Sequence, residues 1–236
     1  KTSSLRFYEF FILIHLFSFL KKLVLRKGLS MALQVEDLED QSKYRQIQKV
    51  PYDELITFVL EYLKRRTGLM VFFWSVCIVL IGLALTIRIN IAGYFPLKNI
   101  MIHSLLGLVV FPVIIIPVHE FFHIIPFWII GAKRIRIGMD LKQYMFYVTA
   151  HKHVVPDSQF RLIGFFPFLI ISACLIVLIL FLPGLWKWSF SLLLFVHTTM
   201  CAGDFAMMNF FRLNRKKKLY TWDDADKKIA YFYEEI

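Results

Sequence analysis

The sequence predicts an all-α polytopic membrane protein with about four transmembrane helices and a small β-hairpin inserted between the second and the third. Three observations lead to this fold class. Of the 236 residues, 58% are hydrophobic and only 19% are charged, whereas soluble domains average about 45–50% apolar residues. Four apolar runs are each long enough to cross a bilayer. Basic residues cluster at the ends of these runs, where they orient membrane proteins.

The four expected spans fix a topology. They are Gly68–Ile87, Ile100–Ile130, Leu162–Leu182 and Trp186–Phe211. Basic clusters lie before the first span, between the second and the third, and after the fourth: Lys64–Arg66, Lys133–Arg136 and Arg212–Lys218. With four spans these clusters share one side of the membrane, which the positive-inside rule makes the cytoplasmic side. We therefore expect both termini to be cytoplasmic.

The segments outside the spans differ in character. The first 30 residues are apolar and basic but too short to span, which suits an interfacial segment or non-native sequence upstream of a start at Met31. Further on, Ile56, Val59, Leu60 and Leu63 fall at helical spacing and predict an amphipathic helix. The expected organisation is an N-terminal segment (1–30), a cytoplasmic amphipathic region (31–66), a membrane-embedded domain (67–212) and a cytoplasmic tail (213–236).

Between the second and third spans the hydrophobic period changes from helical to alternating. Ile135, Ile137 and Met139 alternate with charged residues and glycine, and Phe146 and Val148 alternate in the same way. A period of two is typical of β-strands. The segment therefore predicts a β-hairpin that turns near residues 140–143.

The most specific motif lies inside the second span. His119-Glu120-Phe121-Phe122-His123 has the pattern H-E-x-x-H, which on a helix puts both imidazoles on one face, where they can bind one metal ion. Glu120 is then placed to hold and deprotonate a water molecule. Charged and metal-binding groups are costly in lipid and usually mark function there.

A catalytic zinc site needs a third protein ligand. Asp204 is the best candidate, because it is the only acidic residue of the fourth span. At 1.5 Å per residue, His119 and His123 lie about 10–17 Å from the cytoplasmic end of their span, and Asp204 about 10 Å from the same side. Asp157, just before the third span, is the rival, although an Asp-Ser pair before a helix more often caps it.

Other candidate ligands are weaker. His197 and Cys201 share a helix face with Asp204. His197 could support a ligand by a hydrogen bond, stabilise an oxyanion, or join two helices as a buried polar residue. Cys201 suits packing better than metal binding. His151 and His153 suit an exposed surface, and His15 and His103 have no assigned role. The cysteines lack C-x-x-C spacing and predict buried, reduced thiols: Cys77, Cys174 and Cys201.

Together, these features resemble a family of bacterial membrane proteins described as putative zincin peptidases. The resemblance covers roughly Tyr52–Tyr220 and includes Phe166-Pro167-Phe168 and His197-x-x-x-Cys201-x-Gly203-Asp204. The same arrangement of residues is similar, more distantly, to that of the site-2 intramembrane metalloproteases. It implies a bound Zn²⁺ with His119, His123 and Asp204 as ligands, Glu120 as the catalytic base, and a location in the bacterial inner membrane.

The preferred functional hypothesis is a zinc-dependent, membrane-embedded endopeptidase. Its expected partners are a membrane protein or peptide substrate and the lipid bilayer. Nucleic acid is not expected despite the net charge of +11, because the basic residues flank spans. The alternative is a non-catalytic membrane protein, in which a structural metal site serves a scaffold or partner-binding subunit. A transporter is a weaker third option, since four spans without a repeat are few for that role.

Overall fold

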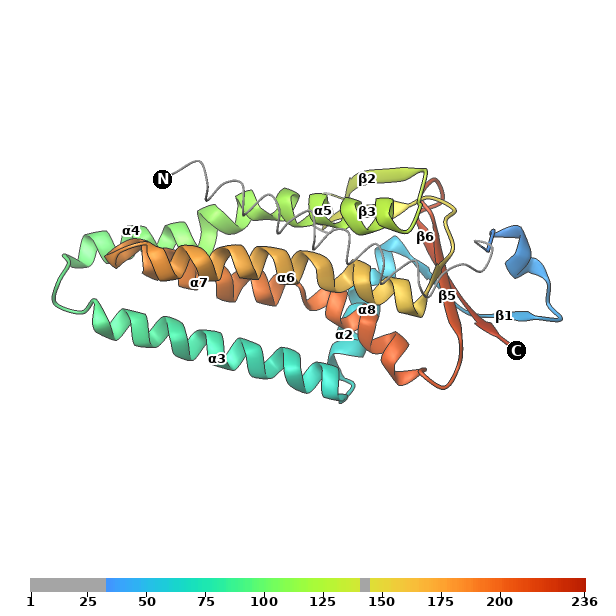
Figure 1. Ribbon diagram of the computed structural model, residues 1–236, viewed down its shortest axis with the longest axis horizontal. Helices are drawn as coiled ribbons and strands as arrows, with labels where there is room; N and C mark the ends of the chain where they lie inside the picture. The colour runs from blue at the N-terminus through green and yellow to red at the C-terminus, as the bar shows by residue number, and fades with distance from the viewer. Residues whose placement is uncertain (1–32, 141–144) are drawn as a thin grey trace, which may run out of the picture.

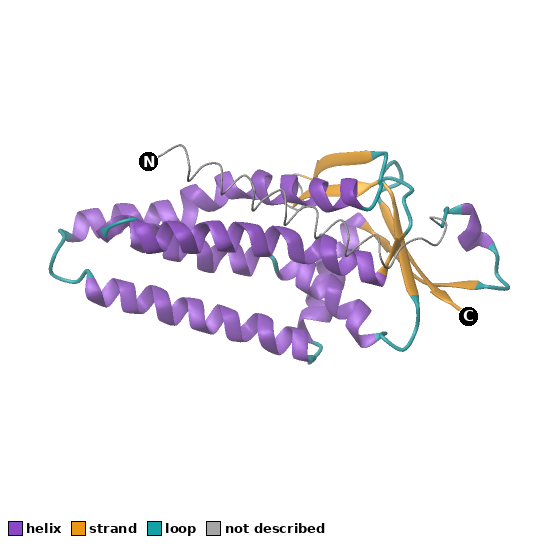
Figure 2. Cartoon of the chain, in the orientation of Figure 1, coloured by secondary structure: helices purple, strands orange, loops and turns teal. Residues whose placement is uncertain are grey.

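The computed structural model describes residues 33–140 and 145–236. Long helices lie side by side in an elongated body, and most of the strands gather at one end (Figures 1 and 2). Four helical segments in the described part are long and apolar enough to cross a membrane: Gly68–Asn90, Leu97–Ile129, Asp157–Phe181 and Gly184–Leu213. The four predicted apolar helices are therefore confirmed. The segment 1–30 and the hairpin turn at 141–143 lie outside the described residues.

Two of these four segments are continuous helices, and two are divided. The continuous ones are the first, α3 (Gly68–Asn90), and the third, α6 (Asp157–Phe181). The second consists of α4 (Leu97–Leu105), a π-helical turn (Leu106–Val110) and α5 (Phe111–Ile129). The fourth consists of α7 (Gly184–Met200) and α8 (Ala202–Leu213), which meet at Cys201. π-turns and breaks inside long helices occur often at functional sites.

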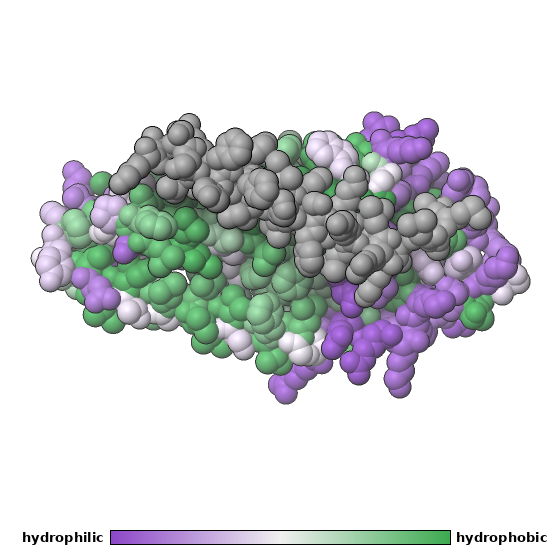
Figure 3. All heavy atoms as spheres, viewed as in Figure 1, coloured by the Kyte–Doolittle hydropathy of each residue, from purple (hydrophilic) through white to green (hydrophobic). Residues whose placement is uncertain are grey.

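The outer faces of the helices are apolar. Val71, Ile78 and Leu85 of α3 are 61%, 69% and 56% exposed. In Figure 3 hydrophobic residues cover most of the helical surface that the grey atoms leave visible, and hydrophilic residues gather around the strands. Soluble monomers rarely expose a continuous apolar surface of this extent. These helices therefore indicate an integral membrane protein, and the cytoplasmic orientation of the strand-bearing end stays a prediction.

The fold is not purely α-helical, and here the predicted fold class is wrong in part. The expected hairpin is present as β2 (Ile135–Asp140) and β3 (Met145–Ala150). A second, four-stranded antiparallel sheet was not predicted. Its order is β1-β6-β5-β4, formed by β1 (Tyr44–Pro51), β4 (Val155–Pro156), β5 (Leu219–Asp224) and β6 (Ile229–Glu235).

The pairing of β1 with β6 joins the chain before the first span to the chain after the last. Lys49 pairs with Tyr231 and Pro51 with Ile229. The helical part therefore begins and ends at the same face of the molecule. This geometry agrees with an even number of spans.

A short helix links the sheet to the membrane-spanning part. After two 3₁₀ turns (Glu36–Glu39 and Tyr52–Glu54), α2 runs over Leu55–Lys64 and includes the predicted amphipathic stretch. Its buried residue is Phe58, whose ring lies 5.5 Å from that of Phe210 and 5.7 Å from that of Phe232. Ile56 and Leu60 are exposed instead. The helix thus packs one face on α8 and β6 and leaves an apolar face outward.

Asn209 fixes α8, which carries Asp204, against the connection between α2 and α3. Its amide nitrogen donates to the carbonyl oxygens of Tyr62 and Arg65, at 2.7 and 2.9 Å. Its amide oxygen accepts from the hydroxyl of Thr67 at 2.6 Å. Asn209 is fully buried, so these bonds replace the water that the end of α2 would otherwise need. The position of α8 is therefore set by polar contacts as well as packing.

Candidate metal centre

The H-E-x-x-H motif lies in α5, as its helical spacing predicts. His119 and His123 are both buried, and their ring centroids are 5.1 Å apart. Gly131, with a φ of 90°, ends the helix two residues after Ile129 and turns the chain toward β2. A left-handed residue at this position is the usual helix terminus, and glycine adopts it without strain. His123 is six residues from the end of α5, or about 9 Å along the axis.

The structure brings the carboxylate of Asp204 to both histidines. Oδ2 lies 3.2 Å from Nε2 of His119, and Oδ1 lies 3.5 Å from Nε2 of His123. Asp204 is in the first turn of α8, just after the break at Cys201. The agreement in depth that the sequence suggested is therefore met in the geometry, although the role of Asp204 as a metal ligand is a separate proposal.

The separations between these atoms fit a zinc site. Ligand atoms about 2.05 Å from a zinc ion and at tetrahedral angles lie about 3.3 Å from one another. The two distances to Asp204, 3.2 and 3.5 Å, are close to that value, and they end on the two different oxygens of its carboxylate. In addition, His119, Glu120 and His123 form a group whose possible ligand atoms lie within 4.8 Å of one another. Two imidazoles and a carboxylate are also a donor set that zinc commonly takes.

A proline in the neighbouring helix fixes the ring of His123. Nδ1 of His123 lies 3.2 Å from the carbonyl oxygen of Ile163 in α6. In a regular helix that carbonyl would accept from the N–H four residues later, but residue 167 is proline and has no N–H. The Ile163 carbonyl is thus free to accept from Nδ1–H. This hydrogen bond leaves Nε2 of His123 as the unprotonated nitrogen, facing Asp204.

His119 is held from the other side by α7. Its Nδ1 lies 3.3 Å from Nε2 of His197, and the sulfur of Cys201 lies 4.0 Å from the same Nδ1. Both His197 and Cys201 are fully buried. When Nδ1 of His119 donates to His197, its Nε2 is free to bind a metal beside Asp204. His119, His197 and Cys201 also form a possible metal-binding group of their own.

The backbone of strand β3 in the hairpin lies beside Glu120 of the motif. The backbone of Val148 in β3 lies close to the Glu120 carboxylate. His151 N–H donates to the Arg134 carbonyl at 2.8 Å, so the alternation of the ladder turns the N–H and C=O of Val148 away from β2. The outer edge of β3 therefore runs beside Glu120.

These two backbone partners could not be predicted from the sequence. The carbonyl of Ile163 and the peptide group of Val148 are present in any residue type, so no side chain marks them. Pro167 is the one sequence signal, since a proline inside a helix frees the carbonyl four residues earlier.

Residues 112–219 match the family described as putative zincin peptidase. The matched zincin segment begins in α5 and ends at the first residue of β5, so it contains the H-E-x-x-H motif, the hairpin and Asp204. No curated protein and no solved structure matches the chain.

The family match confirms the recognition made from sequence, over a shorter range than expected. The resemblance extended from Tyr52 to Tyr220, whereas the zincin match starts 60 residues later, at residue 112. The first span, α3, and the strands β1 and β6 lie outside the match. They are therefore features of this chain that the family comparison does not describe.

The remaining candidate residues of the zincin segment lie away from the two motif histidines. Asp157 begins α6 and pairs with Arg161 at 3.6 Å. It precedes Ile163, the partner of His123, by six residues, about 9 Å along the helix. His151 is buried, contrary to expectation, and its Nδ1 accepts from the N–H of Ala225 at 3.1 Å. His153 is half-buried.

Outside that segment, His103 has a structural contact. Its Nδ1 lies 2.8 Å from the hydroxyl of Ser189, joining α4 to α7. His15 lies outside the described residues. Of the three cysteines, Cys77 and Cys201 are buried as predicted, whereas Cys174 is exposed on the apolar surface of α6; all three are free thiols.

Proposed function

We propose that this protein is a zinc-dependent, membrane-embedded endopeptidase that hydrolyses peptide bonds of membrane or membrane-tethered proteins. The observation that carries the proposal is the placement of Asp204 between His119 and His123, at 3.2 and 3.5 Å. Three ligands with an acid-base residue beside them leave a fourth position for the substrate, as catalytic zinc sites do. The zincin family match supports the same function.

The residues divide the chemical work. When bound, zinc supplies Lewis-acid polarisation of the scissile carbonyl and of the attacking water. Glu120 takes a proton from that water and passes it to the leaving amine. Hydrogen bonds from His123 to Ile163 and from His119 to His197 hold both imidazoles with Nε2 toward Asp204.

The substrate is proposed to bind as an extended strand along the outer edge of β3. The Val148 peptide group on this edge points away from β2, and no strand of the described chain pairs there. Backbone pairing with an edge strand holds a substrate extended and independent of its sequence. It would bring a peptide bond past Glu120. A membrane helix must unwind before it can bind in this way, which favours substrates with helix-breaking residues near the membrane surface.

The decisive experiment measures zinc and cleavage separately. The full chain is purified in detergent, its zinc content is determined, and cleavage is followed with a reporter that tethers a casein segment to one transmembrane helix. Glu120→Gln is expected to retain about one zinc per chain and lose cleavage, because only the proton acceptor is removed. Asp204→Ala is expected to lose zinc as well. Asp157→Asn is the matched control and should keep both.

Two outcomes would overturn the proposal. The first is a wild-type protein that binds no zinc after purification without chelators. The second is cleavage by Glu120→Gln at the wild-type rate. A zinc-loaded, folded protein that cleaves neither this reporter nor a family of tethered peptides would favour the alternative below.

The alternative is a structural metal site in a non-catalytic scaffold or partner-binding subunit. It is favoured by the group of His119, His197 and Cys201, which lies on the Nδ1 side of His119. However, the Cys201 thiol donates to the His197 carbonyl at 3.2 Å, as a protonated thiol does. The two sites are separable by zinc content: Cys201→Ser removes the metal only if this second group binds it.

A further inference from the structure

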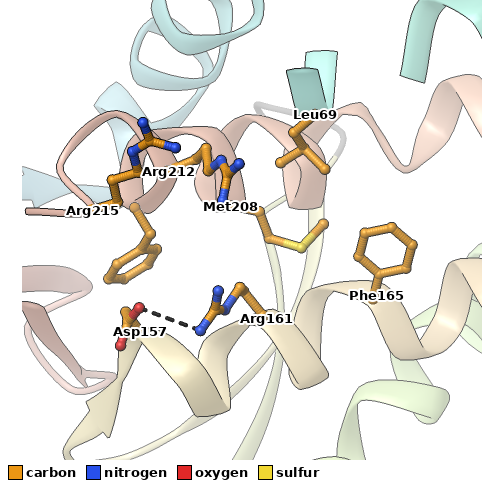
Figure 4. A pocket seen from close by; sticks show the side chains of 8 residues that line it. Leu69, Asp157, Arg161, Phe165, Met208, Arg212 and Arg215 are labelled. Atoms are coloured by element: carbon orange, nitrogen blue, oxygen red, sulfur yellow. Dashed lines mark ion pairs between the residues drawn. The ribbon is translucent and has the colours of Figure 1, made fainter. Parts of the chain in front are cut away.

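A pocket of about 270 Å³ opens at the strand-bearing end of the helices (Figure 4). It lies between the start of α6, the end of α8 and the first turn of α3. Figure 4 shows Arg161 on the α6 side, with Arg212 and Arg215 on the opposite side. It is separate from the H-E-x-x-H motif, none of whose residues lines it.

The charges around the pocket are not balanced. Asp157 is the only acid that lines it, and it pairs with Arg161 at 3.6 Å, where both side chains are substantially exposed. Within residues 33–140 and 145–236, neither Arg212 nor Arg215 makes an ion pair. Among the described residues, Arg212 and Arg215 therefore leave two positive charges at the pocket without an acidic partner. Guanidinium groups bind phosphate oxygens in paired, planar geometry, so the preferred ligand is a phosphate.

The floor of the pocket is apolar. Met208 and Phe211 are buried, and Leu69 and Phe165 are partly buried beside them. At about 30 Å³ for each water molecule, the volume corresponds to about nine waters, which is room for a phosphate with its glycerol. A ligand with a phosphate at one end and hydrocarbon next to it matches a pocket with arginines at its rim and apolar residues on its floor.

Apolar surface continues from the pocket along the spans. Phe72 of α3 and Leu169 of α6 are 45% and 57% exposed, and the ring of Phe72 lies 6.4 Å from that of Phe165. Arg161 is four residues from the start of α6, and Arg212 is one residue from the end of α8. The arginines thus lie at the expected membrane surface, and the exposed apolar residues lie deeper.

We propose that this pocket binds the phosphate headgroup of an anionic phospholipid, with its acyl chains against Phe72 and Leu169. Basic pockets between spans on the cytoplasmic side bind such headgroups, and each Arg near the surface contributes on the order of 1 kcal/mol. The pocket lies on α8, whose first turn carries Asp204. Bound lipid would therefore hold α8 in place.

The test compares lipids by native mass spectrometry of the full chain in detergent. The probes are phosphatidylglycerol, zwitterionic phosphatidylcholine and inorganic phosphate. Wild type is expected to prefer phosphatidylglycerol about tenfold or more, and Arg161→Gln/Arg212→Gln is expected to lose that preference. Arg134→Gln/Arg136→Gln removes the same charge from the hairpin region and should keep it. Arg215→Gln alone, at an exposed position after α8, should weaken binding severalfold without affecting folding.

The outcomes are distinct. Equal binding of phosphatidylglycerol by wild type, the double pocket variant and Arg215→Gln would overturn the proposal. Displacement of the lipid by millimolar inorganic phosphate would also overturn it, because the ligand would then be a soluble phosphate compound. Loss of the phosphatidylglycerol preference in the hairpin control would also overturn the proposal, because the preference would then depend on net charge and not on the pocket. Zinc content and cleavage are measured independently of lipid binding, so failure here leaves the proposed peptidase function untouched.

Discussion

The carbonyl oxygen of Ile163 accepts a hydrogen bond from His123 at 3.2 Å, and the residue that would ordinarily donate to it within the helix is Pro167. The proline therefore influences the candidate metal centre through the backbone of α6. A ligand histidine usually has its second ring nitrogen bonded in this way, and the bond sets both the tautomer and the ring orientation.

Replacing this proline tests the relationship. Pro167→Ala restores an N–H that competes with His123 for the Ile163 carbonyl, so His123 loses its orienting partner. We expect zinc affinity to fall about tenfold or more, while the helix itself becomes more regular. Competition titration against a chromogenic chelator measures the affinity. Unchanged zinc affinity would show that the Ile163 carbonyl does not orient His123.

A second prediction concerns the contact between the π-helical turn and α7. A Cβ on Gly107 would overlap the carbonyl oxygen of Ser189 and press on Leu192. We expect Gly107→Ala to destabilise the protein by about 1–3 kcal/mol, since a packed interface must separate. Gly82→Ala is the matched control, because its added Cβ meets nothing within 4 Å and alanine favours a helix. Thermal unfolding in detergent should show a lower Tm for the first variant only.

The third prediction is a pH dependence in the sheet. Asp223 in β5 accepts from the Tyr52 hydroxyl at 3.3 Å, and burial raises the pKa of its carboxyl to about 6. The folded state thus favours the protonated form. Its contribution to stability is complete below the ordinary pKa, near 3.8, and is lost as the pH rises through about 6.

Asp223→Asn mimics the protonated carboxyl and keeps an acceptor for Tyr52. We expect the wild-type Tm to fall between pH 4.5 and about pH 7, and the Tm of the variant to fall less over the same range. At pH 7 the variant should therefore have the higher Tm. Asp226→Asn, at an exposed side chain, serves as the control and should follow wild type. The same pH slope in Asp223→Asn and wild type would refute the assignment.

The sequence predicted well what depends on local pattern. Apolar runs identified the four long helices, and alternation identified β2 and β3, because both signals repeat within one segment. The meeting of Asp204 with His119 and His123 also followed from the pattern. Each of these three residues lies a similar number of residues from the basic end of its span. The basic ends lie on the same membrane surface, so the three residues are expected at a similar depth.

The four-stranded sheet could not be predicted in the same way. On β6 the inward-facing residues are Ala230, Phe232 and Glu234, while tyrosines face the other side. A buried glutamate on one face and partly buried tyrosines on the other hide the alternation. Glu234 is tolerated because it pairs with Arg45 and Lys217, and both partners are distant in sequence. Such a strand is specified by tertiary contacts that no short window contains.

The pairing of β1 with β6 also sets an order of events during synthesis. The partner of Pro51 is Ile229, so β1 emerges from the ribosome roughly 180 residues before the strand that completes it. At 5–20 residues per second, this interval is on the order of ten seconds or more. All four helices are translated within it. The sheet therefore forms only after the last helix has been made. A chain truncated before β6 leaves β1 without its pairing strand, so the backbone groups of β1 that β6 would pair stay unpaired.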